Sequence, residues 1–110
     1  MSTLTHLKPA YAIAGGDTDF PAMQVKGSQI MVTTELQDLN TSDASLELHQ
    51  SIDASEWGLI PDSNQVLTAG QTSHHWNVGG LVSGAYVRVS LKKGTATAGT
   101  INAIKMLGNE

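Results

Sequence analysis

At 110 residues the chain is long enough for one domain with a single core, and the absence of cysteine excludes disulfide bonds and thiolate metal sites. The net charge of −4 argues against a nucleic-acid partner, because phosphate binding needs a concentrated basic face. No apolar run reaches the roughly 18 residues of a membrane helix, and the N-terminus shows no leader pattern. We therefore expect a soluble, unexported polypeptide with no membrane partner.

Acidic and basic side chains are unevenly distributed along the chain. Residues 1–64 hold nine acidic and two basic side chains, whereas residues 65–110 hold one acidic and four basic side chains. If the two halves interleave in one domain, these charges mix on its surface. The alternative is a polarised molecule whose opposite faces meet copies of itself or a partner.

Residues 1–27 are predicted to form an extended N-terminal arm with one or two short strands. Pro9, Pro21 and the pair Gly15-Gly16 prevent a long strand in this segment. Its apolar side chains are too many for a solvated tail, and they are the candidate partner-binding residues: Leu4, Leu7, Tyr11, Ile13, Phe20 and Met23. The arm can pack on its own domain or on a neighbour. We predict contact with a neighbour, so that deleting the arm spares the fold and weakens attachment.

Residues 28–110 are expected to form the folded β-domain. Residues 28–39 alternate apolar and polar side chains and include several β-branched ones, which predicts a strand with one buried face. The polar residues 40–43 are predicted to form a turn that joins it, as a hairpin, to a second strand at 46–53.

The second of these strands shows a clear period of two. Leu46, Leu48 and Ile52 fall on its apolar face. The alternation breaks after Ile52, so we expect a bulge or turn there, and we expect Trp57 to lie over an edge of the core.

Four further strands are predicted in the remainder of the chain. They cover residues 65–68, 71–78, 85–92 and 100–107, and Leu81 is expected to close one end of the domain. The last strand has apolar residues on both faces, so we expect it to be covered on both sides. The residues predicted to face inward from the others are His74, Trp76, Val78, Val87 and Val89.

No window of the sequence shows a helical period with caps. About seven short strands separated by turn signals favour an all-β fold, an antiparallel β-sandwich that is Ig-like or jelly-roll-like. No helix longer than about two turns is expected.

The sequence offers no metal, cofactor or catalytic site. His74 and His75 are adjacent, and neighbours in a strand point to opposite faces, so they are poorly placed to share a metal ion. Asp17, Thr18 and Asp19 lack the other positions of a calcium loop and are interpreted as a flexible turn. No Gly-x-Ser-x-Gly elbow is present, so no enzyme activity is expected.

Three aromatic residues are the best candidates for a small-ligand site. Trp57, Trp76 and Tyr86 can together form a platform on which a sugar stacks. With only five Phe, Trp and Tyr residues in the chain, the alternative is that the core uses at least one of these tryptophans.

Two motifs carry a resemblance to a known group of proteins. The first is a strand that ends in Ser-x-Asp-x-x-x-Trp, here Ser51, Asp53 and Trp57. The second is a later strand that begins with Tyr-x-Arg, here Tyr86 and Arg88. In this arrangement the chain resembles small β-sandwich proteins from the structural gene modules of tailed bacteriophages.

The likeness covers residues 28–107 and leaves the arm outside the pattern. It implies a virion structural protein without catalytic residues, first a capsid decoration (cement) protein that binds the outside of the assembled head. The implied partners are the major capsid protein of the same virion and further copies of the chain. The implied location is the capsid surface, after synthesis in the host cytoplasm. Open alternatives are a tail, fibre or head-tail module and, third, a carbohydrate-binding β-sandwich module.

Overall fold

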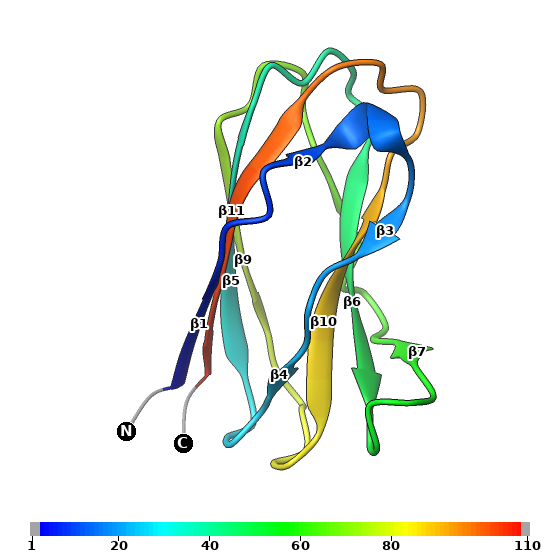
Figure 1. Cartoon of the computed structure of the whole chain (residues 1–110). Coiled ribbons are helices and arrows are strands. Elements are labelled where there is room, and N and C mark those ends of the chain that lie inside the picture. Colours follow the sequence, from blue (N-terminus) through cyan, green and yellow to red (C-terminus); the bar gives the residue numbers. More distant parts are fainter. Residues whose placement is uncertain (1–2, 109–110) are drawn as a thin grey trace.

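The computed structural model describes residues 3–108, which form two antiparallel sheets packed face to face (Figure 1). One short 3-10 helix, η1 (Ile13–Gly15), interrupts the strands, and the described residues contain no α-helix. The strands are β1 (Thr3–Leu7), β2 (Tyr11–Ala12), β3 (Thr18–Asp19), β4 (Met23–Gln24), β5 (Ile30–Gln37), β6 (Ser45–Ser51), β7 (Gly58–Leu59), β8 (Gln65–Val66), β9 (Ser73–Val78), β10 (Tyr86–Lys92) and β11 (Thr100–Gly108). The all-β prediction is confirmed, with more strands than the seven expected.

The strand order is that of a jelly roll. Sheet A has the order β1-β11-β5-β9, with β2 also paired to β11. Sheet B has the order β3-β10-β6-β7, with β4 also paired to β10 and β8 to β6. The first and last strands are neighbours, and the chain passes repeatedly from one sheet to the other, as in double-sheet jelly rolls. In the described range, no helix is long and apolar enough to cross a membrane.

The predicted hairpin around residues 40–43 is wrong. β5 lies in sheet A and β6 in sheet B, so this turn carries the chain across the core instead of pairing the two strands. Period-two alternation shows only that each strand has one buried face, which is equally true of paired strands and of strands that face each other across a sandwich.

The core lies between the inner faces of the two sheets. The predicted inward residues of β6 and β10, with Trp76 and Val78 of β9, are buried, and Leu81 closes one end of the sandwich. Ile52 was expected on the inner face of the strand, but it is almost fully exposed. The reason is that β6 ends at Ser51, so Ile52 no longer follows the pleat.

The last strand contains a bulge. The register between β11 and β5 shifts between Ile101 and Ala103, which places Ile101, Ile104 and Met106 on the buried side. The expectation that β11 is covered on both faces is therefore wrong at Leu107, whose side chain is partly exposed on the outer face.

The N-terminal segment belongs to the sandwich. β1 and β2 pair with β11 in sheet A, whereas β3 and β4 pair with β10 in sheet B, so the segment crosses from one sheet edge to the other (Figure 1). Ile13, Phe20 and Met23 are buried in the core, and Leu7 and Tyr11 pack partly against it. The prediction that a neighbour supplies this burial is wrong for Ile13, Phe20 and Met23. Proline and glycine shorten the strands here but do not prevent edge pairing.

Candidate functional site

The adjacent histidines of β9 point to opposite faces, as the alternation predicts. His74, predicted to face inward, is only partly buried, with Nε2 2.9 Å from Gln65 Oε1 of β8 and Nδ1 2.8 Å from Gln71 Nε2. Burial, with a smaller effect of the neighbouring His75, lowers the pKa of His74. On the outer face His75 Nδ1 lies 2.9 Å from Thr33 Oγ1. Among the described residues no group of three or more His, Asp or Glu side chains is placed to hold a metal ion.

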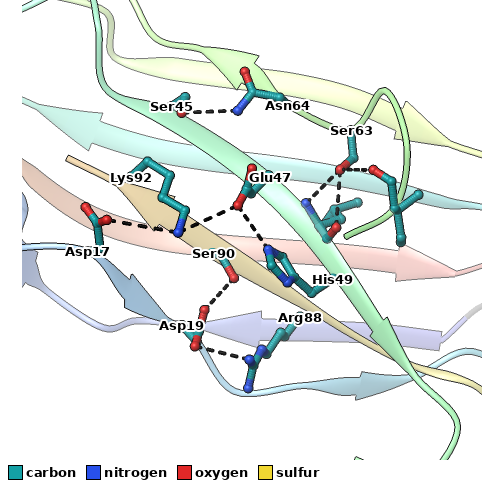
Figure 2. A network of polar contacts seen from close by, with 12 residues as sticks. Asp17, Asp19, Ser45, Glu47, His49, Ser63, Asn64, Arg88, Ser90 and Lys92 are labelled. Carbon is teal, nitrogen blue, oxygen red and sulfur yellow. Dashed lines mark hydrogen bonds and ion pairs between the residues drawn. The ribbon is translucent and has the colours of Figure 1, made fainter. Parts of the chain in front are cut away.

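Asp17 and Asp19 fasten the N-terminal segment to β10. Asp17 Oδ1 accepts a hydrogen bond of 2.9 Å from the Lys93 N–H. Asp19 accepts one of 2.5 Å from the Ser90 hydroxyl and lies 3.1 Å from Arg88 Nη2 (Figure 2). These carboxylates are engaged with different partners along the strand, so they do not converge as in a calcium loop.

The outer face of sheet B carries a row of charged side chains from β6 and β10 (Figure 2). Glu47 Oε1 lies 3.0 Å from His49 Nε2 and 3.9 Å from Lys92 Nζ. Arg88 is opposite His49 in the register, so its pair with Asp19 continues the row. Cations and carboxylates alternate here and largely satisfy one another, which favours a structural role or polar recognition over capture of one strongly charged ligand.

The three aromatic residues proposed as a platform are not all together. Trp76 is buried in the core, with its ring 5.4 Å from the His74 ring. Trp57 is only partly buried and is not in the core; the Arg88 guanidinium lies 4.1 Å from its ring centroid, a cation–π contact. Tyr86 precedes Arg88 by two positions on the same strand and so shares its outer face. The outer face of sheet B therefore keeps two of the three rings.

A set of exposed apolar side chains crosses the outer face of sheet A. Leu4 of β1 is directly opposite Leu107 of β11, and Leu107 is directly opposite Met31 of β5. Their residues are 62%, 41% and 47% exposed, respectively. We call Leu4, Leu107 and Met31 the apolar row. The next outward residue to Leu107 on β11 is Lys105, which forms an ion pair of 3.6 Å with Glu35 of β5.

Of the six candidate partner-binding residues, Leu4 is the one in this row. Sequence reasoning missed Met31, because it is a single apolar residue on the wet face of its strand. It missed Leu107 because the last strand was expected to be covered on both faces. Only the pairing of β1, β11 and β5 brings residues that are far apart in the sequence side by side.

Comparisons with known proteins identify similar folds but no function. No protein-family model matches the sequence, and no curated protein matches it significantly. Solved structures do match, including the SPBc2 prophage-derived protein YomS, at a TM-score of 0.55 and 10% identity over 97% of this chain and 93% of that one. A subunit of the endospore appendages of Bacillus, described as disulfide-linked pili, matches at a TM-score of 0.51 and 10% identity over 99% and 87%.

A carbohydrate-binding module is also among the matches. The module of the family 9 glycoside hydrolase Cel9A from Ruminococcus flavefaciens matches at a TM-score of 0.51 and 10% identity, covering 96% of this chain and 97% of that one. At such identities the likeness shows the fold alone, because one sandwich fold hosts many functions. The chain is a β-sandwich of a type shared by a prophage-derived protein, pilus subunits and binding modules.

Proposed function

We propose that the protein is a non-enzymatic structural protein of a bacteriophage particle, a decoration (cement) subunit that binds the outer surface of the assembled head. Its partners are the major capsid protein of the same virion and further copies of itself. It is made in the host cytoplasm and resides on the capsid surface. The phage-like motifs around Trp57 and Arg88 and the similarity in fold to a prophage-derived protein support this proposal.

The apolar row is the observation that carries it. Single exposed apolar residues are ordinary on a protein surface, but three in direct register across three strands form a continuous strip. Full burial of side chains of this size contributes roughly 1.5–3 kcal/mol each. Because the strip lies on a paired sheet, little conformational entropy is lost when a shell covers it.

Binding to assembled heads tests the proposal. The triple variant Leu4→Thr, Leu107→Thr, Met31→Thr keeps β-forming residues at all three positions while removing the apolar surface. We expect it to remain folded and to cosediment with heads at least about tenfold less than the unchanged chain. The control is Val66→Thr, an exposed apolar residue in sheet B. Equal cosedimentation of the triple variant contradicts the proposal.

A different experiment distinguishes a location on the head from the alternative location in a tail or fibre. Electron microscopy of purified particles, with an antibody to the protein, shows where it sits. Label over the head supports the decoration role, whereas label confined to the tail replaces it with the tail or fibre module.

A second candidate function is glycan binding on the outer face of sheet B. The observation that favours it is the partly exposed Trp57 beside the polar row, since aromatic faces and planar polar groups recognise sugars. Arg88 lies over one face of the indole, so a sugar that stacks on Trp57 must use the opposite face. Affinity electrophoresis on xylan and galactan tests this idea: retention that Trp57→Ala abolishes and Trp57→Phe preserves supports it, and no retention on either glycan opposes it.

A further inference from the structure

A cleft of about 640 Å³ opens at the end of the sandwich where β6 ends and β10 begins. The two strands are neighbours in sheet B, with Ser51 opposite Tyr86, so the loops that follow and precede them lie side by side (Figure 1). The lining residues are Gln50, Ser51, Ile52, Asp53, Glu56, Val82, Ser83, Gly84 and Ala85.

Two aliphatic side chains, one from each loop, line the cleft. Ile52 is 91% exposed and Val82 is 71% exposed, the two highest values among the large hydrophobic residues that the structure describes as exposed. Leaving such side chains in water forfeits the free energy of their burial, so a partner that covers both gains it. Neither residue belongs to the apolar row, and the cleft is a separate surface.

The loop that carries Ile52 is held in one conformation. Asp53 Oδ1 accepts hydrogen bonds from the Ser51 hydroxyl at 2.9 Å and from the N–H groups of Ser55 at 2.9 Å and Glu56 at 3.1 Å. The Asp53 N–H in turn donates to Ser51 Oγ at 3.2 Å. Ile52 is thus fixed between two anchored residues.

The loop that carries Val82 is fastened in the same way. The Leu81 N–H donates to the Ser28 carbonyl at 2.9 Å, and Leu81 itself is buried. The Ser83 hydroxyl donates to the Lys26 carbonyl at 2.7 Å, and the Ala85 N–H donates to the Val82 carbonyl at 3.0 Å. Both walls of the cleft are therefore ordered before a partner arrives, which removes part of the entropic cost of binding.

The charged side chains that line the cleft are all acidic. Its lining contains two carboxylates, Asp53 and Glu56, and no lysine or arginine. The N–H groups of Ser55 and Glu56, followed by the Ser51 hydroxyl, lower the pKa of Asp53, so this carboxylate stays ionised in mildly acidic solution. An occupant with positive charge next to an apolar group matches both features.

We propose that this cleft binds an extended polypeptide segment of a partner protein, in which an aliphatic side chain packs between Ile52 and Val82 and a neighbouring lysine or arginine faces Asp53 and Glu56. An extended segment suits a site that is open to solvent along its length, whereas a small molecule needs an enclosed one. This site goes beyond head binding through the apolar row, and the two can be disrupted independently.

The test is a nitrogen-15 NMR titration of the full chain with three end-blocked peptides of equal length. The probes are Lys-Leu-Lys-Leu-Lys, Lys-Ser-Lys-Ser-Lys and Glu-Leu-Glu-Leu-Glu. We expect the first to bind with a Kd of about 1 mM or tighter and to shift the amides of residues 50–56 and 82–85. We expect Ile52→Ser and Glu56→Gln each to weaken it about three- to tenfold. The control Val66→Ser, at an exposed site away from the cleft, leaves the affinity unchanged.

Several outcomes overturn the proposal. Equal binding of the serine peptide shows that the aliphatic contact is absent, and equal binding of the glutamate peptide shows that the carboxylates do not select charge. No shifts at 50–56 and 82–85 with the first peptide rejects the site. If the same amides shift when the protein alone is diluted, the occupant is a second copy instead of a basic segment. None of these results bears on head binding by the triple variant of the apolar row.

Discussion

Two buried hydroxyl groups, those of Ser63 and Thr34, differ in whether they form hydrogen bonds. Ser63 is buried, yet its Oγ accepts from the Leu48 N–H at 3.0 Å and is 2.7 Å from the Ile60 carbonyl, so its desolvation is compensated. Thr34, on the inner face of β5, is completely buried, and its Oγ1 has no hydrogen-bond partner among the described residues. An uncompensated buried hydroxyl costs about 1–3 kcal/mol.

Thr34→Val should therefore stabilise the protein. Valine replaces the hydroxyl by a methyl group of similar shape, so the packing is kept and the unsatisfied group is removed. We expect the free energy of unfolding to rise by about 1 kcal/mol in urea titrations. The control is Thr33→Val, because Thr33 is on the outer face and its hydroxyl contacts His75. A decrease on Thr34→Val shows that the hydroxyl finds a partner, such as a buried water.

Asp43 makes stability depend on pH. Its carboxylate accepts hydrogen bonds from the Thr41 hydroxyl at 2.6 Å, and from the N–H at 3.1 Å and the hydroxyl at 2.8 Å of Thr95. These contacts, that with the Thr41 hydroxyl first, lower the pKa of Asp43 below its ordinary value of 3.8. A depressed folded-state pKa stabilises the protein above the unfolded pKa, and the stabilisation is lost as the pH falls through the folded value.

Asp43→Asn should lower the melting temperature at pH 6, and the difference from the unchanged chain should shrink as the pH falls below about 4. Thermal melts across this range measure it. Glu56→Gln, which removes a carboxylate from an exposed position elsewhere, is the control. A difference that stays constant between pH 6 and pH 2 contradicts the linkage and assigns the effect to lost packing.

At the scale of elements, the turn between β5 and β6 is tied to the loop between β10 and β11. Asn40 also links the two segments, because its Nδ2 donates a hydrogen bond of 2.7 Å to Thr97 Oγ1. Gly94 fits closely beside Asp43: its φ is +60°, and a Cβ there would lie 2.6 Å from Asp43 Oδ1 and 2.7 Å from the Asp43 carbonyl oxygen. The crossing from one sheet to the other thus depends on a position without a side chain.

Gly94→Ala should destabilise the protein more than Gly80→Ala. Both glycines have positive φ, so alanine costs about 1 kcal/mol at each, but a Cβ at Gly80 meets open space. At Gly94 the added methyl group displaces backbone, which we expect to raise the loss to roughly 2–4 kcal/mol. Urea titrations of the two variants give the comparison. If the two variants lose the same free energy of unfolding, the loop around Gly94 accommodates the added methyl group without disturbing Asp43.

The sequence predicted well those strands whose apolar and polar side chains alternate regularly along the strand itself. Val87 and Val89 are buried because their strand keeps a strict period of two, and this pattern needs no knowledge of a partner strand. Ile52 was misplaced because the end of β6 depends on the Asp53 turn. The candidate site was predictable only at Leu4: a strip across three strands arises from pairing, and pairing depends on turns whose direction is not encoded in alternation.

At the scale of the whole molecule, the N-terminal segment connects the two sheets along one side. Asp19 pairs with Arg88 on the outer face of sheet B, and the Phe20 N–H donates to the Val89 carbonyl at 2.9 Å. The Ile13 N–H donates to the Gly99 carbonyl at 2.9 Å, just before β11 begins in sheet A. The segment is therefore part of the sandwich, whereas the sequence predicted an arm that contacts a neighbour.

Two truncations of different length test this conclusion. Residues 11–110 lack β1 but keep Ile13, Phe20 and Met23, whereas residues 28–110 lose all three buried side chains and both short strands on β10. Burial of the three contributes on the order of 5–9 kcal/mol, comparable with the whole net stability of a small domain.

We accordingly expect residues 11–110 to melt cooperatively at a reduced temperature, because an edge strand is lost but the core remains closed. Residues 28–110 should show no cooperative transition and should expose apolar surface to a hydrophobic dye. Heating followed by circular dichroism measures both. If residues 28–110 instead melt near the temperature of the full chain, the core is complete without the segment, and the apolar side chains of residues 1–27 are then available to a neighbouring subunit on the particle.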